Sequence, residues 1–361
     1  MKKIVFTVTN DLMYDQRMIR ICTSLAGADF EVLLVGATKK DSAPLPRRPF
    51  GQKRLRMFFQ KGKAFYIEYN TRLFFYLLFT RLQAICAIDL DTILPCYFIS
   101  ILKGIPRVYD AHELFCEMKE VVTRSRIYGF WKRIERFTVP KFKYGYTVNQ
   151  PIAEEFQKMY GVKYEVIRNV PLLQPLTIPE KKERYILYQG AVNEGRSFET
   201  LIPAMKQVNV PLIICGDGNF MQQAQQLVKE LGLEQKVIFQ GKVEPETLRN
   251  FTGNAWAGVT IFENNGLSNY YSLANRFFDY IHSGVPQICV AYPAYKTINN
   301  QAAVAVLLND THPGTIANGL NTLLNDQELY ESLQQNCLKA REQYNWQEEE
   351  KKLRAFYSTI F

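Results

Sequence analysis

The chain has 361 residues, which suits two domains of ordinary size and exceeds one typical core. A composition of 47% hydrophobic and 22% charged residues is that of a globular protein and excludes a disordered chain. Residues 1–170 carry 28 Lys and Arg against 16 Asp and Glu, a net +12, and the remainder carries 16 against 19, a net −3. This asymmetry indicates that an anionic partner meets the first half.

The N-terminal residues, the short apolar stretches and the cysteines predict a protein of a reducing compartment. Residues 1–3 lead directly into the short apolar run 4–8, so we expect no signal peptide. The longest strictly apolar stretch, residues 73–79, is far below the roughly 20 residues that a spanning helix needs. Seven scattered cysteines without CxxC spacing favour a cytoplasmic protein. None of the three histidines lies near a cysteine pair, so we predict no zinc site.

Short β-branched runs alternate with amphipathic stretches along the chain, which is typical of parallel sheets covered by helices. We therefore predict an α/β protein with two doubly wound Rossmann-like domains, residues 1–170 and 171–344, facing each other across a cleft. The proline-rich stretch 169–179 separates them, and residues 345–361 are expected to form a helix that packs back across both. The predicted strands are residues 4–9, 31–36, 84–88, 107–110, 144–148, 165–167, 185–189, 212–215, 237–240, 258–262, 287–291 and 304–308.

The segment from Asn269 to Pro286 has the pattern of an anion site. A loop enters a helix near Ala274, and the helix ends at Gly284 before a buried strand. The first backbone N–H groups of such a helix, at Ala274 and Asn275, suit a diphosphate. Arg276 lies in the first turn, where a cation is unfavourable unless an anion is bound. Asp279 follows one turn later and can accept hydrogen bonds from a ribose diol.

These residues resemble the donor-binding helix of family 4 glycosyltransferases, which have the GT-B fold. In that family a Glu-x7-Glu pattern precedes a Gly-x-Pro turn, and the second acid binds the ribose hydroxyls. Asp279 matches the second acid by its distance from Gly284 and Pro286. Tyr271 occupies the position of the first acid, so the carboxylate that contacts the sugar hydroxyls in the family is replaced by a phenol here. From the residues alone, an ordinary surface helix is an equal alternative.

Three further segments follow the order of the same family. Residues 188–196 resemble its donor loop, with Gly190 in the turn and Arg196 at the position of a lysine that neutralises the leaving diphosphate. The family arginine is Ala191 here, so Arg276 is expected to supply the second cation. Residues 214–218 match a Gly-x-Gly turn, which is common in α/β domains. Residues 239–243, with Gly241 and Val243, resemble the segment whose backbone meets the nucleotide base.

In the first half, residues 108–113 end a buried strand with the sequence Val-Tyr-Asp-Ala-His-Glu. The family places Asp-x-His-Glu here, and the resemblance implies that His112 faces the donor sugar. Asp110 either fixes the tautomer of His112 or caps the loop. Asp15 and Arg17 follow the first strand and are candidates for acceptor contact, with helix capping by Asp15 as an equal alternative. Asp89 and Asp91 are interpreted as structural.

Two stretches, residues 47–81 and 124–143, combine Lys and Arg with many aromatic residues. This composition suits an anionic membrane surface or a lipid-phosphate acceptor, and Lys53, Arg54 and Arg56 are its predicted centre beside Phe58 and Phe59. The alternative is that the aromatic residues are core and the charges are solvated. No nucleic-acid-binding module is recognisable, so nucleic acid is not an expected partner.

The resemblance implies a retaining glycosyltransferase that uses a nucleotide-sugar donor, a glycan or lipid-linked acceptor and no metal or other cofactor. A role in cell-surface polysaccharide or glycolipid synthesis follows, on the inner face of the membrane. The roles implied are catalytic for His112, Arg196 and Arg276, and donor-binding for Gly190, Gly241, Val243, Tyr271, Ala274, Asn275 and Asp279. A nucleotide-sugar epimerase on the same fold, or a non-catalytic nucleotide-sugar or membrane-binding module, are the alternatives.

Overall fold

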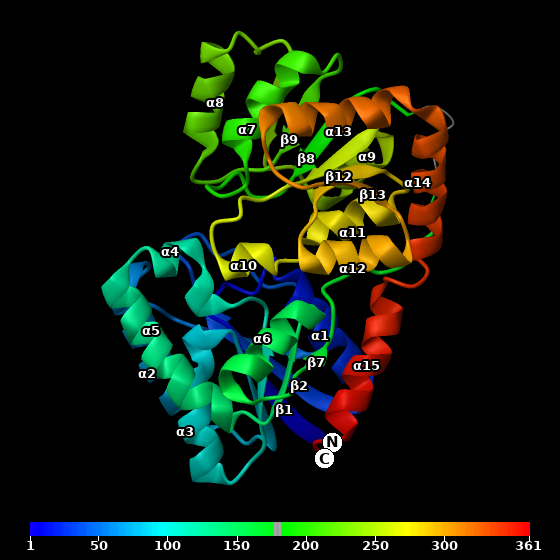
Figure 1. The fold of residues 1–361 in the computed structure, drawn as a ribbon. Helices are drawn as coiled ribbons and strands as arrows, with labels where there is room; N and C mark the ends of the chain where they lie inside the picture. The colour runs from blue at the N-terminus through cyan, green and yellow to red at the C-terminus, as the bar shows by residue number, and fades with distance from the viewer. Residues whose placement is uncertain (177–178, 180–181) are drawn as a thin grey trace. The chain divides into compact units, whose positions relative to one another are not determined.

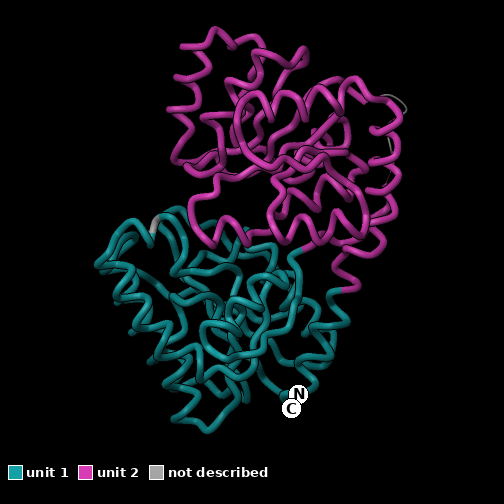
Figure 2. The backbone as a smooth tube through the Cα atoms, in the orientation of Figure 1, with its two compact units in different colours: residues 1–169, 349–361 teal, residues 170–348 magenta. Residues whose placement is uncertain are grey.

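The computed structural model describes residues 1–176, 179 and 182–361, and the backbone alone of Glu120 (Figure 1). Residues 177 and 178 of the expected linker 169–179 therefore lie outside the described residues. The chain divides into two compact units, unit 1 with residues 1–169 and 349–361 and unit 2 with residues 170–348 (Figure 2). Each holds one parallel sheet, of seven and six strands, which confirms the prediction of a two-domain α/β protein.

The sheet of unit 1 has the strand order β3-β2-β1-β4-β5-β6-β7. Its strands are β1 (Lys2–Thr7), β2 (Phe30–Ala37), β3 (Gly51–Leu55), β4 (Ala84–Ile88), β5 (Arg107–Ala111), β6 (Tyr144–Thr147) and β7 (Glu165–Val166). The helices are α1 (Gln16–Ala26), α2 (Gly62–Phe79), α3 (Ile93–Lys103), α4 (Lys119–Val122), α5 (Ser125–Thr138) and α6 (Gln150–Tyr160), with short 3-10 turns at 90–92, 115–117 and 139–141.

The sheet of unit 2 has the strand order β10-β9-β8-β11-β12-β13. Its strands are β8 (Ile186–Gln189), β9 (Leu212–Cys215), β10 (Val237–Gly241), β11 (Ala257–Thr260), β12 (Gln287–Val290) and β13 (Ala305–Leu308). The helices are α7 (Phe198–Ala204), α8 (Met221–Glu230), α9 (Pro245–Asn254), α10 (Leu267–Tyr270), α11 (Asn275–His282), α12 (Pro293–Gln301), α13 (Pro313–Asn325) and α14 (Gln327–Ala340), with a 3-10 turn at 205–207.

Continuous apolar runs explain why these segments form central strands. All five residues of β4 and all four of β8, β11 and β12 are buried, as expected for parallel strands with helices on both faces. The edge strand β3, with the sequence Gly-Gln-Lys-Arg-Leu, was not predicted. It is polar and only Leu55 is buried, which an edge position tolerates because only one side of the strand pairs.

The last helix, α15 (Trp346–Ser358), contains the point at which the chain returns to unit 1. Trp346 belongs to unit 2, where its backbone N–H donates to the Pro171 carbonyl at 2.8 Å. Tyr357 belongs to unit 1 and is fully buried, with its ring centroid 5.9 Å from Phe6 and 6.3 Å from Tyr146. Burial of this ring fixes the C-terminal turns to the sheet of unit 1.

No helix in the described part of the chain is both long and apolar enough to cross a bilayer. All seven cysteines are buried free thiols.

Close packing in unit 2 can be tested at Gly258 in β11. A Cβ there would lie 2.5 Å from the ring of Tyr280, which is buried and held by a 2.8 Å hydrogen bond to the Leu187 carbonyl. We predict that Gly258→Ala lowers the free energy of unfolding by about 1–3 kcal/mol, because the ring must move. Gly253→Ala in α9 is the matched control, since a Cβ there meets no atom within 4 Å. Equal urea midpoints for both variants would contradict this packing.

Candidate functional site

The polar residues of unit 2 gather where its strand order reverses, between β8 and β11. Parallel α/β sheets bind ligands beyond the carboxyl ends of strands at such switch points. Here β8 is followed by Gly190 and β9 by Gly216, and the two approach so closely that a Cβ on Gly216 would lie 1.7 Å from the Gly190 carbonyl oxygen. Gly190 has a φ of 124°, which side chains rarely adopt. This edge therefore exposes backbone rather than side chains.

Arg276, in the first turn of α11, is a buried cation without a carboxylate. Its side chain is 8% exposed, and Nη1 donates to the Tyr188 hydroxyl at 3.1 Å and to the Gln189 carbonyl at 3.3 Å. Nε and Nη2 are buried and have no hydrogen-bond partner. No salt bridge to Arg276 is present among the described residues. Burying a charge with unsatisfied donors is costly, so this site is incomplete without an anion.

Two aromatic rings hold this guanidinium. Its Cζ lies 4.5 Å from the ring centroid of Tyr188, at the end of β8, and 4.7 Å from that of Phe262, after β11. The Cζ of Arg196 lies 4.6 Å from the same Phe262 ring. The structure thus brings together the two cations that the sequence singled out, on rings that supply cation–π attraction and no negative charge.

Asp279 is held one turn further along α11. Its Oδ2 accepts a 2.9 Å hydrogen bond from Gln189 Nε2, and Gln189 Oε1 accepts one of 2.7 Å from Thr252. Because a carboxylate only accepts, the amide of Gln189 is oriented with its NH₂ toward Asp279 and its oxygen toward the Thr252 hydroxyl. This buried chain fixes the carboxylate of Asp279 beside the open edge of β8.

The other predicted donor residues surround α11 and β10. Ala274 precedes the helix, and its N–H donates to the buried Tyr295 hydroxyl at 3.0 Å, while Asn275 is exposed at the first helical position. Tyr271 is half-buried at the end of α10. Gly241 ends β10 with a φ of 66°, and Val243 packs partly against the small core cluster around Tyr280 and Val285.

Unit 1 has a second polar cluster at its own switch point, between β1 and β4. Asp89 follows β4 with a φ of 54°, a strained value for a residue other than glycine, and Asp91 accepts a 2.6 Å hydrogen bond from Thr9. Burial raises the pKa of Asp91 to about 6 and that of Asp89 to about 7. A strained backbone and two carboxylates held at raised pKa values are typical of functional sites.

His112 lies between two carboxylates in this cluster. Its Nε2 is 3.1 Å from Asp110 Oδ2, its Nδ1 is 3.4 Å from Asp89 Oδ2, and its backbone N–H donates to Asp89 Oδ1 at 2.9 Å. Burial lowers the pKa of His112, but the charges of Asp110 and Asp89 outweigh this and raise the pKa to about 9. The imidazole is therefore a cation at neutral pH.

Arg17 completes the cluster and differs from Arg276 in being fully paired. Nη2 and Nε contact Asp110 at 2.8 and 3.3 Å, and Nη1 donates to the Ile167 carbonyl at 3.0 Å. Burial acts to raise the pKa of Asp110, but Arg17 and His112 hold it below its usual value. Only 3% of Arg17 is exposed, so it is enclosed by the protein and reaches His112 only through their shared partner Asp110. Asp15 caps α1 by accepting from the Met18 N–H at 3.0 Å.

Comparison with known proteins relates part of unit 2 to a described family. Residues 174–340 match the family model of the glycosyl transferases group 1.

One relative supports the same assignment. The uncharacterized glycosyltransferase MJ1607 of Methanocaldococcus jannaschii is 26% identical over 171 residues, which cover 45% of this chain and 42% of the relative. The chain thus matches less than half the length of that protein.

Solved structures show the fold of the whole chain. Sucrose-phosphate synthase from Thermosynechococcus elongatus superposes with a TM-score of 0.82 at 15% identity, covering 100% of this chain and 99% of the other. Anabaena HepE in complex with UDP-glucose gives a TM-score of 0.77 at 13% identity with full coverage of both chains. WaaG, a glycosyltransferase involved in lipopolysaccharide biosynthesis, gives 0.73 at 15% identity and covers 97% of this chain and 98% of WaaG. The chain has the GT-B fold.

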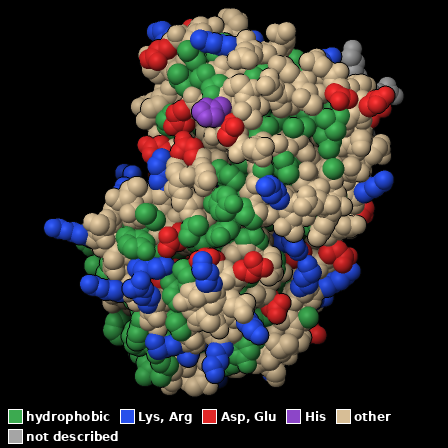
Figure 3. Space-filling model, viewed as in Figure 1, with side chains coloured by type: hydrophobic (Ala, Val, Ile, Leu, Met, Phe, Trp, Pro, Cys, Tyr) green, Lys and Arg blue, Asp and Glu red, His purple; other side chains and the backbone are tan. Residues whose placement is uncertain are grey.

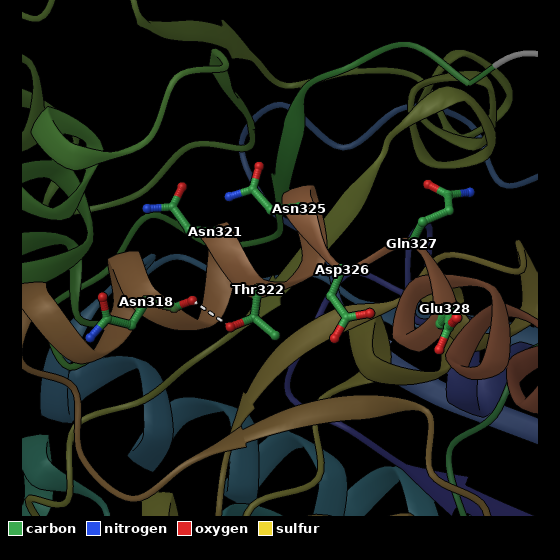
Figure 4. Close-up of a pocket in the computed structure, with 7 residues that line it drawn as sticks. All are labelled: Asn318, Asn321, Thr322, Asn325, Asp326, Gln327 and Glu328. Atoms are coloured by element: carbon green, nitrogen blue, oxygen red, sulfur yellow. Dashed lines mark hydrogen bonds between the residues drawn. The ribbon is translucent and has the colours of Figure 1, made fainter.

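A shallow polar pocket elsewhere in the group 1 glycosyl transferase region does not contain the predicted residues (Figure 4). It lies on α13 and the start of α14, and Thr322 there donates to the Asn318 carbonyl at 2.9 Å. Its lining residues are Asn318, Asn321, Thr322, Asn325, Asp326, Gln327 and Glu328. No cation or aromatic ring lines it, so it lacks the kinds of side chain that gather around Arg276. No group of three or more His, Cys, Asp or Glu side chains within the described ranges could hold a metal ion.

Sequence reasoning missed four residues of these clusters: Tyr188, Gln189, Phe262 and Asp89. Each stands at or just beyond the carboxyl end of a strand beside a switch point. The same positional rule that singled out His112 would have found them, had the strand order been known.

The charge state of His112 gives a testable consequence. We predict that one of the three histidine imidazoles titrates near pH 9 in ¹H–¹⁵N NMR spectra. A raised folded-state pKa stabilises the fold fully below pH 6.5, and this contribution is lost as the pH rises through about 9. Asp89→Asn removes one carboxylate and should move the pKa of His112 back toward 6.5. An unchanged titration in that variant would exclude Asp89 as a cause.

Proposed function

We propose that this protein is a glycosyltransferase that moves a sugar from a nucleotide-sugar donor to a glycan or lipid-linked acceptor. The observation that carries the proposal is Arg276, a buried cation with two unpartnered nitrogens at the switch point of a group 1 glycosyl transferase region. A diphosphate offers the oxygen acceptors that these nitrogens lack. Open glycine backbone beside it leaves room for such a group to approach.

Different residues of unit 2 bind the diphosphate, the ribose and the base of the donor. Arg276 and Arg196 bind the diphosphate and stabilise its charge as the bond to the sugar breaks. Asp279, oriented by Gln189, accepts hydrogen bonds from the ribose hydroxyls. The backbone N–H at Asn275 adds the positive end of α11, while the Ala274 N–H before it is bound to the Tyr295 hydroxyl. The backbone at Gly241 and Val243 meets the base.

In unit 1, the protonated ring of His112 faces the sugar as a positive charge, because its two N–H groups point to Asp110 and Asp89, which act as positioning residues. Transfer proceeds with retention of anomeric configuration, with the departing phosphate taking the proton of the acceptor. The protein then acts by positioning both substrates and by stabilising negative charge. We expect turnover without added metal.

Two neighbours support the substrate classes. HepE was crystallised with UDP-glucose, and WaaG is involved in lipopolysaccharide biosynthesis. We extend these to a nucleotide-sugar donor and to cell-surface polysaccharide or glycolipid synthesis for this chain. Seven buried free thiols favour a cytoplasmic site of action, at an anionic membrane surface where lipid-linked acceptors reside.

The proposal is tested by incubating the protein with UDP-, GDP- and ADP-sugars, with and without EDTA. Release of a free nucleoside diphosphate is the expected result. An altered sugar without release would instead indicate an epimerase. Binding without turnover would indicate a non-catalytic module, an outcome to which Tyr271 in place of the family acid gives a specific basis.

The two arginines should differ from ordinary binding residues in their kinetics. We predict that Arg196→Ala and Arg276→Ala each lower kcat more than they raise KM, because their charge matters most as the diphosphate leaves. Arg276→Lys should recover part of the loss, since it restores charge without the planar fork. Thermal unfolding checks that each variant folds. A loss confined to KM would assign the arginine to ground-state binding.

A further inference from the structure

Exposed large hydrophobic side chains are concentrated in unit 1. Among the described residues, fourteen of the seventeen that are at least 38% exposed belong to it, and three belong to unit 2. Scattered single residues of this kind are normal, but a contiguous set indicates a contact surface.

Eight of the fourteen lie on three neighbouring helices, α2, α3 and α5. Contact between the helices is shown by ring pairs at 5.9 Å between Tyr66 and Trp131 and at 5.3 Å between Tyr97 and Phe137. Figure 3 shows hydrophobic side chains interspersed with Lys and Arg over this part of unit 1. The eight residues, which define the α2–α3–α5 face, are Ile67, Phe75, Phe79, Phe98, Ile101, Leu102, Phe130 and Phe137.

Folding alone does not account for this face. In α2 the residues that pack inward are Phe65, Tyr69, Leu73 and Leu77, spaced four apart and all buried. A helix that covers a sheet needs only this one apolar stripe. The opposite side of α2 nevertheless carries Phe75 and Phe79, the latter 84% exposed.

The same helices are basic and offer no uncommitted carboxylate. Together α2, α3 and α5 contain seven Lys or Arg against two Glu, a net +5. Glu68 accepts from the backbone N–H groups of Phe58 and Phe59 and from Arg72, and Glu135 is buried against Lys132. Arg126, Arg133 and Arg136 on α5 are exposed, as are Arg81 and Lys143 beside the helices.

We propose that the α2–α3–α5 face docks on an anionic lipid bilayer, with its Phe, Ile and Leu side chains entering the headgroup region. A bilayer accepts both apolar and cationic side chains, whereas a second copy of a +5 surface would be repelled. This identifies the surface behind the membrane association proposed above. It also moves the contact away from Arg54, which is bound to Asp11 and to the Ala43 carbonyl.

Vesicle sedimentation tests the surface on the full chain. We expect the protein to pellet with vesicles of phosphatidylcholine and phosphatidylglycerol at low salt, and not with phosphatidylcholine alone. The triple variant Arg126→Gln, Arg133→Gln, Arg136→Gln should lower the partition coefficient about 100-fold, since each cation contributes about 1 kcal/mol and 1.4 kcal/mol is tenfold. The control, Lys206→Gln, Lys229→Gln, Lys339→Gln, changes three exposed cations of unit 2 and should pellet like the wild type.

A second variant tests the apolar part. Phe79→Ser, Leu102→Ser, Phe130→Ser changes only exposed side chains, so the fold and nucleotide binding should persist while pelleting falls. Retained nucleotide binding in every variant separates this proposal from that of sugar transfer. Equal pelleting with neutral and anionic vesicles, or no pelleting with either, would overturn the proposal. A wild-type dimer that dissociates into monomers only in the serine variant would also overturn it.

Discussion

The buried guanidinium of Arg276 is the constraint around which unit 2 is arranged. It lies at a helix N-terminus, where the dipole opposes it, and among the described residues it contacts two aromatic rings and forms no salt bridge. A protein that keeps such a charge loses stability in the absence of a ligand and recovers it when an anion binds. The carboxyl ends of β8 and β9, where Gly190 and Gly216 lie, are the side from which that anion can approach.

Unit 1 also contains a buried guanidinium, but there the protein itself supplies the negative charge. Arg17 is as buried as Arg276, yet Asp110 and the Ile167 carbonyl satisfy its guanidinium completely. The result is a rigid pair that fixes Asp110, and through it the protonated ring of His112. One unit therefore carries an internally neutralised charge that orients a histidine, and the other carries a charge that only a ligand can neutralise.

The sequence predicted most of the strands because their apolar runs are continuous. It also predicted that Arg276 and Asp279 are candidate donor-site residues, because a helix start followed by Gly284 and Pro286 has a recognisable pattern. It did not predict β3, because this strand pairs on one side only and its sequence contains Lys and Arg in place of an apolar run. Tyr188 and Phe262 looked like ordinary strand residues, and their role at Arg276 depends on β8 and β11 being neighbours. The contact of Asp89 with His112 is not visible in the sequence, because it joins residues that follow different strands.

The most direct test of the account is whether Arg276 recognises a diphosphate. Calorimetry should compare a nucleoside diphosphate with its nucleoside, for whichever base binds best, on the wild type, Arg276→Gln and the exposed control Arg249→Gln. Hydrogen bonds to charged groups contribute about 1.5–3 kcal/mol. We therefore predict that the advantage of the diphosphate over the nucleoside falls by about 10- to 100-fold in Arg276→Gln and is unchanged in Arg249→Gln. An equal advantage in all three proteins would contradict the assignment of Arg276 to the diphosphate.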